Sequence, residues 1–184
     1  MRPPIRALAA SGLLVTLGAC TVVEYQYPKD GQPLAPAASE DCRRLEGNFA
    51  DRGEVGSPGQ SPSLTRELFG PNSRWKEATS VRLSLPANDR LEVTVAGREG
   101  TLLAQTFTAR GDEFLCKSGR IVVRGKRWIA TDLVMGRQGV VIEMSEAPKH
   151  LVVKVNEETY GTLFVLVPIA GTAQHWYRFA RLAP

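Results

Sequence analysis

Beyond residue 78 the chain alternates between apolar and polar positions with a period of two. The run 81–85 places Val, Leu and Leu on one side of a strand, and the run 91–95 repeats this with Leu, Val and Val. Pro86-Ala87-Asn88-Asp89 supplies turn-forming residues between the two runs. The pattern predicts a β-hairpin with one buried face.

Similar runs continue to the C-terminus and are separated by residues typical of turns. The predicted strands are 102–109, 113–117, 120–124, 127–132, 140–145, 151–155, 159–168 and 175–182. The predicted turns are 110–112, 118–119, 124–126, 136–139, 156–158 and 171. Short links favour antiparallel neighbours, and a twisted sheet of eight or more strands tends to close or fold onto itself. We therefore predict a mainly β fold, an antiparallel up-and-down meander that forms a barrel or a small sandwich.

One short helix is expected before the hairpin. Residues 42–49 form a strand-like opening, and residues 53–62 form a loop rich in glycine and proline. Ser63 stands where a helix cap is expected, and Leu64 and Leu68 are four residues apart, so they share one helix face. Gly70-Pro71 ends this helix.

The N-terminal segment has the pattern of an export signal. Arg2 and Arg6 flank the start of an apolar run that ends in Leu17-Gly18-Ala19-Cys20. The run is too short to span a bilayer core, which needs about 20 apolar residues. The segment resembles the signal peptide of bacterial lipoproteins, in which small residues precede a cysteine that is lipidated and becomes the mature N-terminus. The mature part also resembles small lipoproteins of Gram-negative bacteria.

This resemblance implies an address. A single acyl chain binds a membrane only marginally, and each further buried methylene group adds to the affinity. Several acyl chains on Cys20 would therefore anchor the protein in a membrane. Thr21 stands where an Asp would retain such proteins in the inner membrane. The resemblance therefore implies a lipid-anchored protein on the periplasmic side of the outer membrane.

Export changes how charge and cysteines are counted. Removing residues 1–19 from the 184 leaves 165 residues, enough for one domain, and lowers the formal charge from +4 to +2. Nothing in this charge demands nucleic acid as a partner. With Cys20 lipidated, Cys42 and Cys116 are the two cysteines that remain, and an oxidising compartment predicts that they form a disulfide.

The predicted domain organisation has three parts. Residues 1–19 are the signal peptide, residues 20–41 the lipidated cysteine with a flexible tether, and residues 42–184 a single β domain. The tether prediction depends on Pro28, Pro33, Pro36 and a scarcity of large apolar residues. Alternation of Val23 with the tyrosines that follow it is the opposing signal, since it would favour an added edge strand.

A second resemblance concerns the strand pattern. Gly47-Asn48-Phe49 opens the domain, and Trp176-Tyr177-Arg178-Phe179 ends it with an aromatic and basic strand. This plan is similar to that of lipocalins and other calycins, in which a Gly-x-Trp opens the barrel and a late Arg packs over the Trp. Phe49 replaces the Trp here. The resemblance implies a barrel that binds a small apolar ligand.

Motifs for catalysis or metal binding are not found in the sequence. The only histidines, His150 and His175, are far apart, and neither a Gly-x-Ser-x-Gly motif nor a phosphate-binding loop is present. Asp89, Asp112, Glu113, Glu157 and Glu158 fall mostly at predicted turns. We therefore predict no catalytic residue, no metal and no cofactor.

One surface stands out by its charge. Its basic residues and a neighbouring tryptophan are candidates to contact lipid phosphates or another anionic envelope polymer: Lys117, Arg120, Arg124, Lys126, Arg127 and Trp128. The simpler interpretation is a solvated face that keeps an exposed strand soluble.

Three functions remain open from the sequence. The first is a non-enzymatic, lipid-anchored protein with a structural or interaction role in the envelope, in contact with the membrane and an envelope protein. The second is a lipocalin-like binder of a small apolar ligand. The third is an envelope hydrolase, which would require a cleft with convergent polar groups and a carboxylate of raised pKa.

Overall fold

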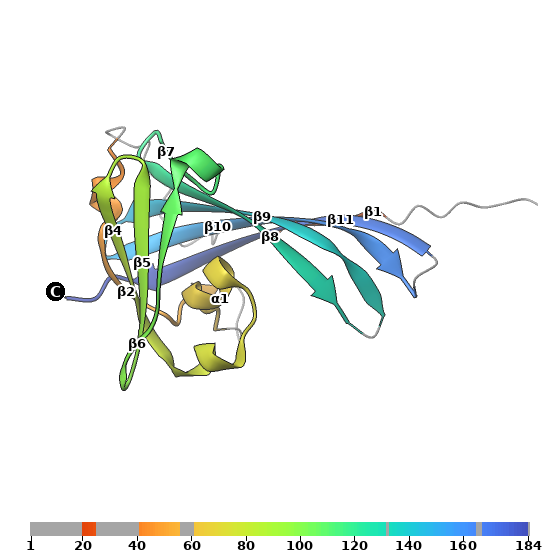
Figure 1. Ribbon diagram of the computed structural model, residues 1–184, viewed down its shortest axis with the longest axis horizontal. Helices are drawn as coiled ribbons and strands as arrows, with labels where there is room; N and C mark the ends of the chain where they lie inside the picture. Colours follow the sequence, from red (N-terminus) through yellow and green to blue (C-terminus); the bar gives the residue numbers. More distant parts are fainter. Residues whose placement is uncertain (1–19, 25–40, 56–60, 132, 165–166, 184) are drawn as a thin grey trace, which may run out of the picture.

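The computed structural model describes residues 20–24, 41–55, 61–131, 133–164 and 167–183. Two β-sheets dominate it (Figure 1). The four-stranded sheet has the order β2 (Gly47–Ala50), β4 (Ala78–Ala87), β5 (Arg90–Gly97), β6 (Gly100–Thr108). The seven-stranded sheet runs β1 (Cys20–Glu24), β11 (Val167–Ala180), β10 (His150–Leu163), β9 (Val134–Ala147), β8 (Arg120–Ala130), β7 (Phe114–Lys117), with β3 (Glu54–Val55) also on β11. The helical pieces are η1 (Cys42–Leu45), α1 (Leu64–Phe69), η2 (Ser73–Glu77) and η3 (Ala109–Gly111).

The predicted mainly β meander is confirmed. From β4 to β11 each strand pairs with the next in antiparallel fashion, except where η3 carries the chain from β6 to β7. The two sheets meet again where Phe49 of β2 forms a bridge with Arg181 and the Leu182 amide donates to the Asn48 carbonyl at 2.8 Å. The sheets thus wrap around one interior, as a split barrel does.

Alternation placed the core correctly. Val81, Leu83 and Leu85 of β4 are at most 6% exposed, and Leu91, Val93 and Val95 of β5 are fully buried, so the predicted hairpin 81–95 is confirmed. The facing sheet contributes apolar residues from its alternating positions, and these side chains fill the space between the sheets: Phe114, Ile121, Val123, Val140, Ile142, Met144, Leu151, Val153, Val155 and Phe179.

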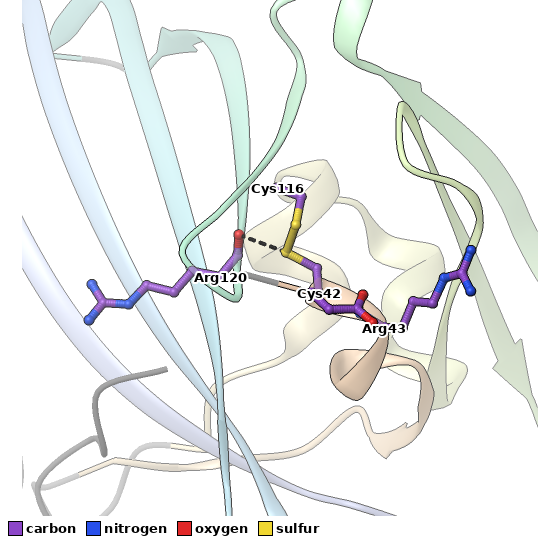
Figure 2. Close-up of a disulfide and its surroundings, with 5 residues drawn as sticks. Cys42, Arg43, Cys116 and Arg120 are labelled. Atoms are coloured by element: carbon purple, nitrogen blue, oxygen red, sulfur yellow. Dashed lines mark hydrogen bonds between the residues drawn. A yellow bond between two sulfur atoms is a disulfide. The ribbon is translucent and has the colours of Figure 1, made fainter. Parts of the chain in front are cut away.

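The predicted disulfide is present and clips one end of this core. Cys42 of η1 is bonded to Cys116 of β7, with 6.0 Å between their Cα atoms and 74 residues between them in sequence (Figure 2). The Cys42 sulfur also lies 3.2 Å from the carbonyl oxygen of Arg120, on the neighbouring strand. The first helical turn of the domain is therefore fixed to the edge of the larger sheet. The strand-like opening predicted over 42–49 is wrong in its first half, where this 3-10 helix forms instead.

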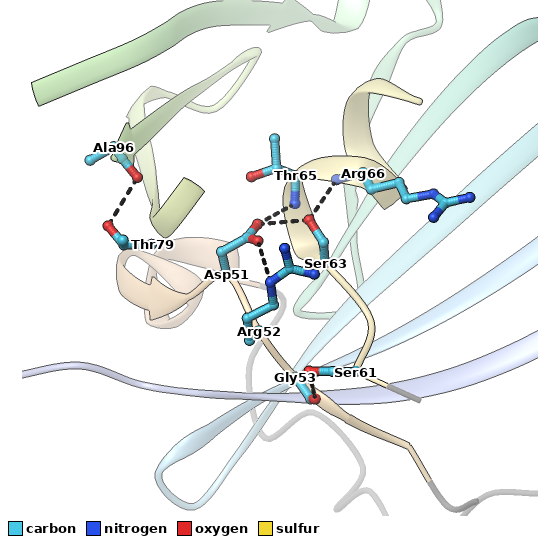
Figure 3. A network of polar contacts seen from close by, with 9 residues as sticks. All are labelled: Asp51, Arg52, Gly53, Ser61, Ser63, Thr65, Arg66, Thr79 and Ala96. Carbon is cyan, nitrogen blue, oxygen red and sulfur yellow. Dashed lines mark hydrogen bonds and ion pairs between the residues drawn. The ribbon is translucent and has the colours of Figure 1, made fainter. Parts of the chain in front are cut away.

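The short helix α1 is confirmed, and a buried carboxylate attaches it to β2. Ser63 caps the helix by accepting from the Arg66 amide at 3.2 Å. Asp51, fully buried after β2, accepts from the Ser63 hydroxyl at 3.1 Å and from the Thr65 amide at 2.9 Å (Figure 3). Charge-assisted hydrogen bonds of this kind are stronger than neutral ones, so they fix the start of α1 to the end of β2.

Four predicted turns are wrong because the strands continue through them. β8, β9, β10 and β11 run without interruption across 124–126, 136–139, 156–158 and residue 171. Glycine and polar residues there are compatible with extended backbone, and these strand halves extend beyond the core, where no apolar alternation is required. As a result the larger sheet projects well past the smaller one (Figure 1).

The start of the predicted tether is also different. Cys20–Glu24 forms β1, which pairs in parallel with β11, Cys20 lying opposite Ala170 and Glu24 opposite Gln174. The edge-strand signal therefore outweighs the tether prediction over these five residues. Residues 25–40, and with them the three tether prolines, lie outside the described residues, as does the signal segment 1–19.

The arginine that packs over Phe49 is Arg181, whereas Arg178 of the predicted terminal motif lies 3.4 Å from Glu54 on β3. The Arg181 guanidinium lies 4.9 Å from the centre of the Phe49 ring, and its Nη1 and Nη2 donate to the carbonyls of Glu46 and Arg44 at 2.7 and 2.8 Å. The positive charge of a guanidinium is attracted to the face of an aromatic ring such as that of Phe49. This contact closes the barrel-like wrap at the end nearest η1.

Candidate functional site

A polar cleft opens between α1 and the projecting part of the larger sheet. Its volume is about 760 Å³, and charged, hydroxyl and aromatic side chains line it. The lining residues are Arg52, Ser61, Pro62, Ser63, Arg66, Glu67, Pro71, Arg127, Trp128, Ile129, Ala130, Thr131, Gln138, Glu157, His175 and Tyr177. The cleft lies where the inner face of the sheet leaves the apolar core and becomes polar.

Side-chain contacts between strands of the larger sheet organise the floor of the cleft. The Arg127 Nη1 of β8 lies 3.8 Å from Oε1 of Glu157 on β10, and the other oxygen of Glu157 lies 4.0 Å from Nε2 of His175 on β11. Arg127 also donates to the backbone carbonyl of Glu67 on α1. The His175 ring stacks on Tyr177, with 6.0 Å between centroids and 4° between planes. One arginine thus connects the helix to the sheet.

Glu67 has the perturbed carboxyl group of the cleft. Its pKa is raised from the ordinary 4.5 to about 7, mainly because burial disfavours the charged carboxylate. The Arg127 and Arg66 guanidinium groups act against this rise, while the negative charge of Glu157 adds to it. Near neutral pH the side chain therefore exchanges a proton, so it can donate or accept a hydrogen bond inside the cleft.

The predicted basic surface does not form one patch. Lys117, Arg120 and Arg124 are on the outer side of the sheet or at its edge, whereas Ile121 and Val123 point into the core. Arg120 lies 3.9 Å from a Glu143 oxygen.

Further along β8 the faces alternate. Lys126 continues the exposed outer face, whereas Arg127 is less exposed and lines the cleft. Trp128, although 63% exposed, also borders the cleft at its mouth. The structure thus separates Arg127 and Trp128 from the other predicted contacts of an anionic surface, which do not line the cleft: Lys117, Arg120, Arg124 and Lys126.

The two histidines have separate environments. The Nδ1 of His150 lies 2.9 Å from the Pro148 carbonyl in the turn between β9 and β10. His175 shares the inner face of β11 with Tyr177 and Phe179. Among the residues that the structure describes, no three His, Cys, Asp or Glu side chains are grouped in a way that would hold a metal ion. No described helix is long and apolar enough to cross a membrane.

Sequence reasoning missed the two carboxylates of the cleft. The sequence predicts a turn at Glu157, because Asn156-Glu157-Glu158 interrupts the apolar alternation. Glu67 falls within the predicted helix, and no pattern around it indicates a functional carboxylate. The strand continues through Glu157 and places it opposite Ala173 on one side and Val140 on the other. A signal was available in the spacing, since Val153, Val155 and Glu157 have the same parity and therefore share one face.

Comparisons with known proteins give no assignment. No family model, no curated protein and no solved structure matches this chain.

Proposed function

We propose that this chain is a non-enzymatic lipoprotein of the bacterial envelope, anchored through Cys20 on the periplasmic side of the outer membrane. The observation that supports this location best is the pairing of the cysteines. Cys42 and Cys116 form a disulfide, which is typical of exported proteins, and this leaves Cys20 alone at the position where a lipoprotein signal requires it.

The anchor is tested by the mass of the mature chain. Purified from membranes of a Gram-negative host, the protein is expected to begin at Cys20 and to carry the mass of its acyl chains. The Cys20→Ala variant should retain the signal segment and carry no acyl mass. A wild-type chain with an unmodified Cys20, or one cleaved elsewhere, would contradict the proposal.

The interaction role is assigned to the cleft. Arg52, Arg66 and Arg127 bring three positive charges to it, against the carboxylates of Glu67 and Glu157. Because the raised pKa of Glu67 leaves it partly protonated at neutral pH, the balance favours a small polar ligand with a negative charge. An apolar ligand has less support, since apolar side chains already fill the space between the two sheets.

Ligand binding is tested with residues 20–184 carrying Cys20→Ser and produced without the signal segment 1–19, hereafter the Cys20→Ser chain. A panel of phosphate monoesters and carboxylated sugars is added, and shifts in melting temperature and native mass are measured. Arg66→Gln should weaken any ligand found by about tenfold, because it removes one charge from the cleft wall. Arg90→Gln, an exposed arginine of β5 away from the cleft, is the matched control. Equal effects of the two variants would contradict a site in the cleft.

A hydrolase remains the second candidate, because the cleft holds a buried carboxyl group of raised pKa together with a second carboxylate. The same ligands distinguish the two functions. If the protein turns over a ligand and Glu67→Gln abolishes turnover but not binding, the chain is an enzyme. If ligands bind unchanged, the non-enzymatic role holds.

A further inference from the structure

Large exposed hydrophobic residues gather at the projecting end of the larger sheet. Among the described residues, eight large hydrophobics are exposed, and six of them lie at this end. We call these six the distal tip: Trp128, Leu133, Met135, Tyr160, Phe164 and Val167. Clusters of exposed apolar residues mark interaction surfaces, whereas single ones are ordinary.

The two turns of the tip are joined to each other. The Phe164 amide donates to the Leu133 carbonyl at 2.8 Å, which brings the β8–β9 turn against the β10–β11 turn. Phe164 is 60% exposed and has a φ of 51°, a left-handed conformation that is uncommon for a bulky residue. The backbone therefore presents an aromatic side chain to the outside at a conformational cost, which points to a use at this position.

The register of the sheet places the anchor beside the tip. Trp128 lies opposite Arg137, Arg137 opposite Tyr160, Tyr160 opposite Ala170, and Ala170 opposite Cys20. One row across five strands therefore contains two exposed amphipathic aromatics, an exposed arginine between them and the backbone of the anchor residue. Trp and Tyr favour the level of lipid headgroups, and arginine pairs with phosphate.

Beyond this row, toward the turns, the exposed large residues are Met135, Val167, Leu133 and Phe164. From Tyr160 to Leu163 the strand advances three residues, or about 10 Å at the rise of a β-strand. This is similar to the depth of about 5–10 Å to which the apolar face of an interfacial amphipathic helix enters the boundary between headgroups and acyl chains. The order of residue types along the sheet is therefore the order found across a membrane interface.

We propose that the distal tip is a membrane-seating surface, which inserts into the interfacial layer of the bilayer that holds the Cys20 acyl chains. This inference rests on the proposed lipid anchor and deepens it. The partner is a phospholipid surface, because the anchor would begin in the same row as the aromatic residues. Seated in this way, the domain lies against the bilayer with its cleft close to the surface, and no long tether separates them.

Fluorescence of the native tryptophans in the acylated full chain tests whether the distal tip inserts into the bilayer. The protein is reconstituted into vesicles of phosphatidylglycerol and phosphatidylcholine, with bromine on the acyl chains of part of the phosphatidylcholine. Trp176→Phe retains Trp128 and the buried Trp75, whereas Trp128→Phe retains Trp176 and Trp75. Trp176 pairs with Lys154, six residues behind Tyr160 on β10, about 20 Å from the tip. Bromine should quench the chain that retains Trp128 and leave the other unchanged. Equal quenching, or none, overturns the proposal.

Partition of the unacylated chain tests the same surface without the anchor. Leu133→Ser with Phe164→Ser should lower the partition of the Cys20→Ser chain into these vesicles at least about tenfold, since each side chain buries a large apolar area. Leu115→Ser changes another exposed leucine, on β7, and is the matched control. A partition that the tip variant leaves equal to the control overturns the proposal.

The mass of the mature chain separates the two failures. An acylated Cys20 without quenching of Trp128 means that the lipid anchor is correct and that insertion of the distal tip is wrong. An unmodified Cys20 with quenching at high lipid concentration means that insertion of the distal tip is correct and that the lipid anchor is wrong. An unmodified chain without quenching overturns both.

Discussion

Replacing Glu67 by glutamine removes a carboxyl group whose burial opposes its ionisation. The group has a pKa of about 7 in the folded chain and an ordinary value of 4.5 when burial is lost on unfolding. Between these values the unfolded chain releases the proton and the folded chain retains it, so the free energy of unfolding of the wild type falls as pH rises. Above about pH 7 this loss of stability is complete, because the carboxyl group is then ionised in both the folded and the unfolded chain. At about 1.4 kcal/mol for a tenfold change in proton affinity, it amounts to up to about 3 kcal/mol.

The glutamine side chain cannot ionise, so the variant escapes this cost while retaining a polar group of similar size. We expect Glu67→Gln to be more stable than the wild type at pH 8 by up to about 3 kcal/mol, with this gain absent near pH 4.5. The measurement is urea-induced unfolding of the Cys20→Ser chain at about pH 4.5, 6 and 8 with the disulfide intact. The quantity compared is the difference between variant and wild type at each pH, which removes the titration of all other groups.

Glu92→Gln on the exposed face of β5 is the matched control and should show no such dependence. A gain from Glu67→Gln that is equal at all three pH values would contradict this explanation, because it would come from the substitution itself and not from ionisation. A loss of stability at pH 8 would mean that the attraction of Arg127 exceeds the desolvation cost, contrary to the order of the causes.

Three further changes test what holds the fold together, each by urea unfolding. Cys42→Ser with Cys116→Ser should lower the free energy of unfolding by about 4 kcal/mol, because the bridge closes a loop of 74 residues in the unfolded chain; an unchanged midpoint would contradict this. Gly136→Ala should lower the free energy of unfolding by about 1–3 kcal/mol, because its Cβ would collide with the Tyr160 carbonyl oxygen of the neighbouring strand β10. Gly125→Ala meets nothing within 4 Å and should lower it less. Arg181→Leu should cost about 2–3 kcal/mol by removing two charged hydrogen bonds and the contact with the ring on β2; a neutral effect would argue against its role in closing the wrap.

Features that depend on local chemistry could be predicted from the residues alone. Alternation over 81–95 identified the hairpin and its buried face, because the period of a strand decides which residues share a side. Ser63 identified the start of α1, since a cap is satisfied within a few residues. The pairing of Cys42 with Cys116 followed from the number of cysteines available, and the meander followed from short links between strands.

The length of the strands and the positions of the polar groups between them depended on the three-dimensional arrangement. Glycines and charges near 125, 137 and 157 are typical of turns, yet each lies within a strand, because cross-strand hydrogen bonds can extend a sheet beyond its apolar core. That extension brings Glu157 to Arg127 and His175, and it brings Cys20 into the row of Trp128 and Tyr160. These neighbours are far apart in sequence and are set by strand register, which no local pattern encodes once the apolar alternation stops.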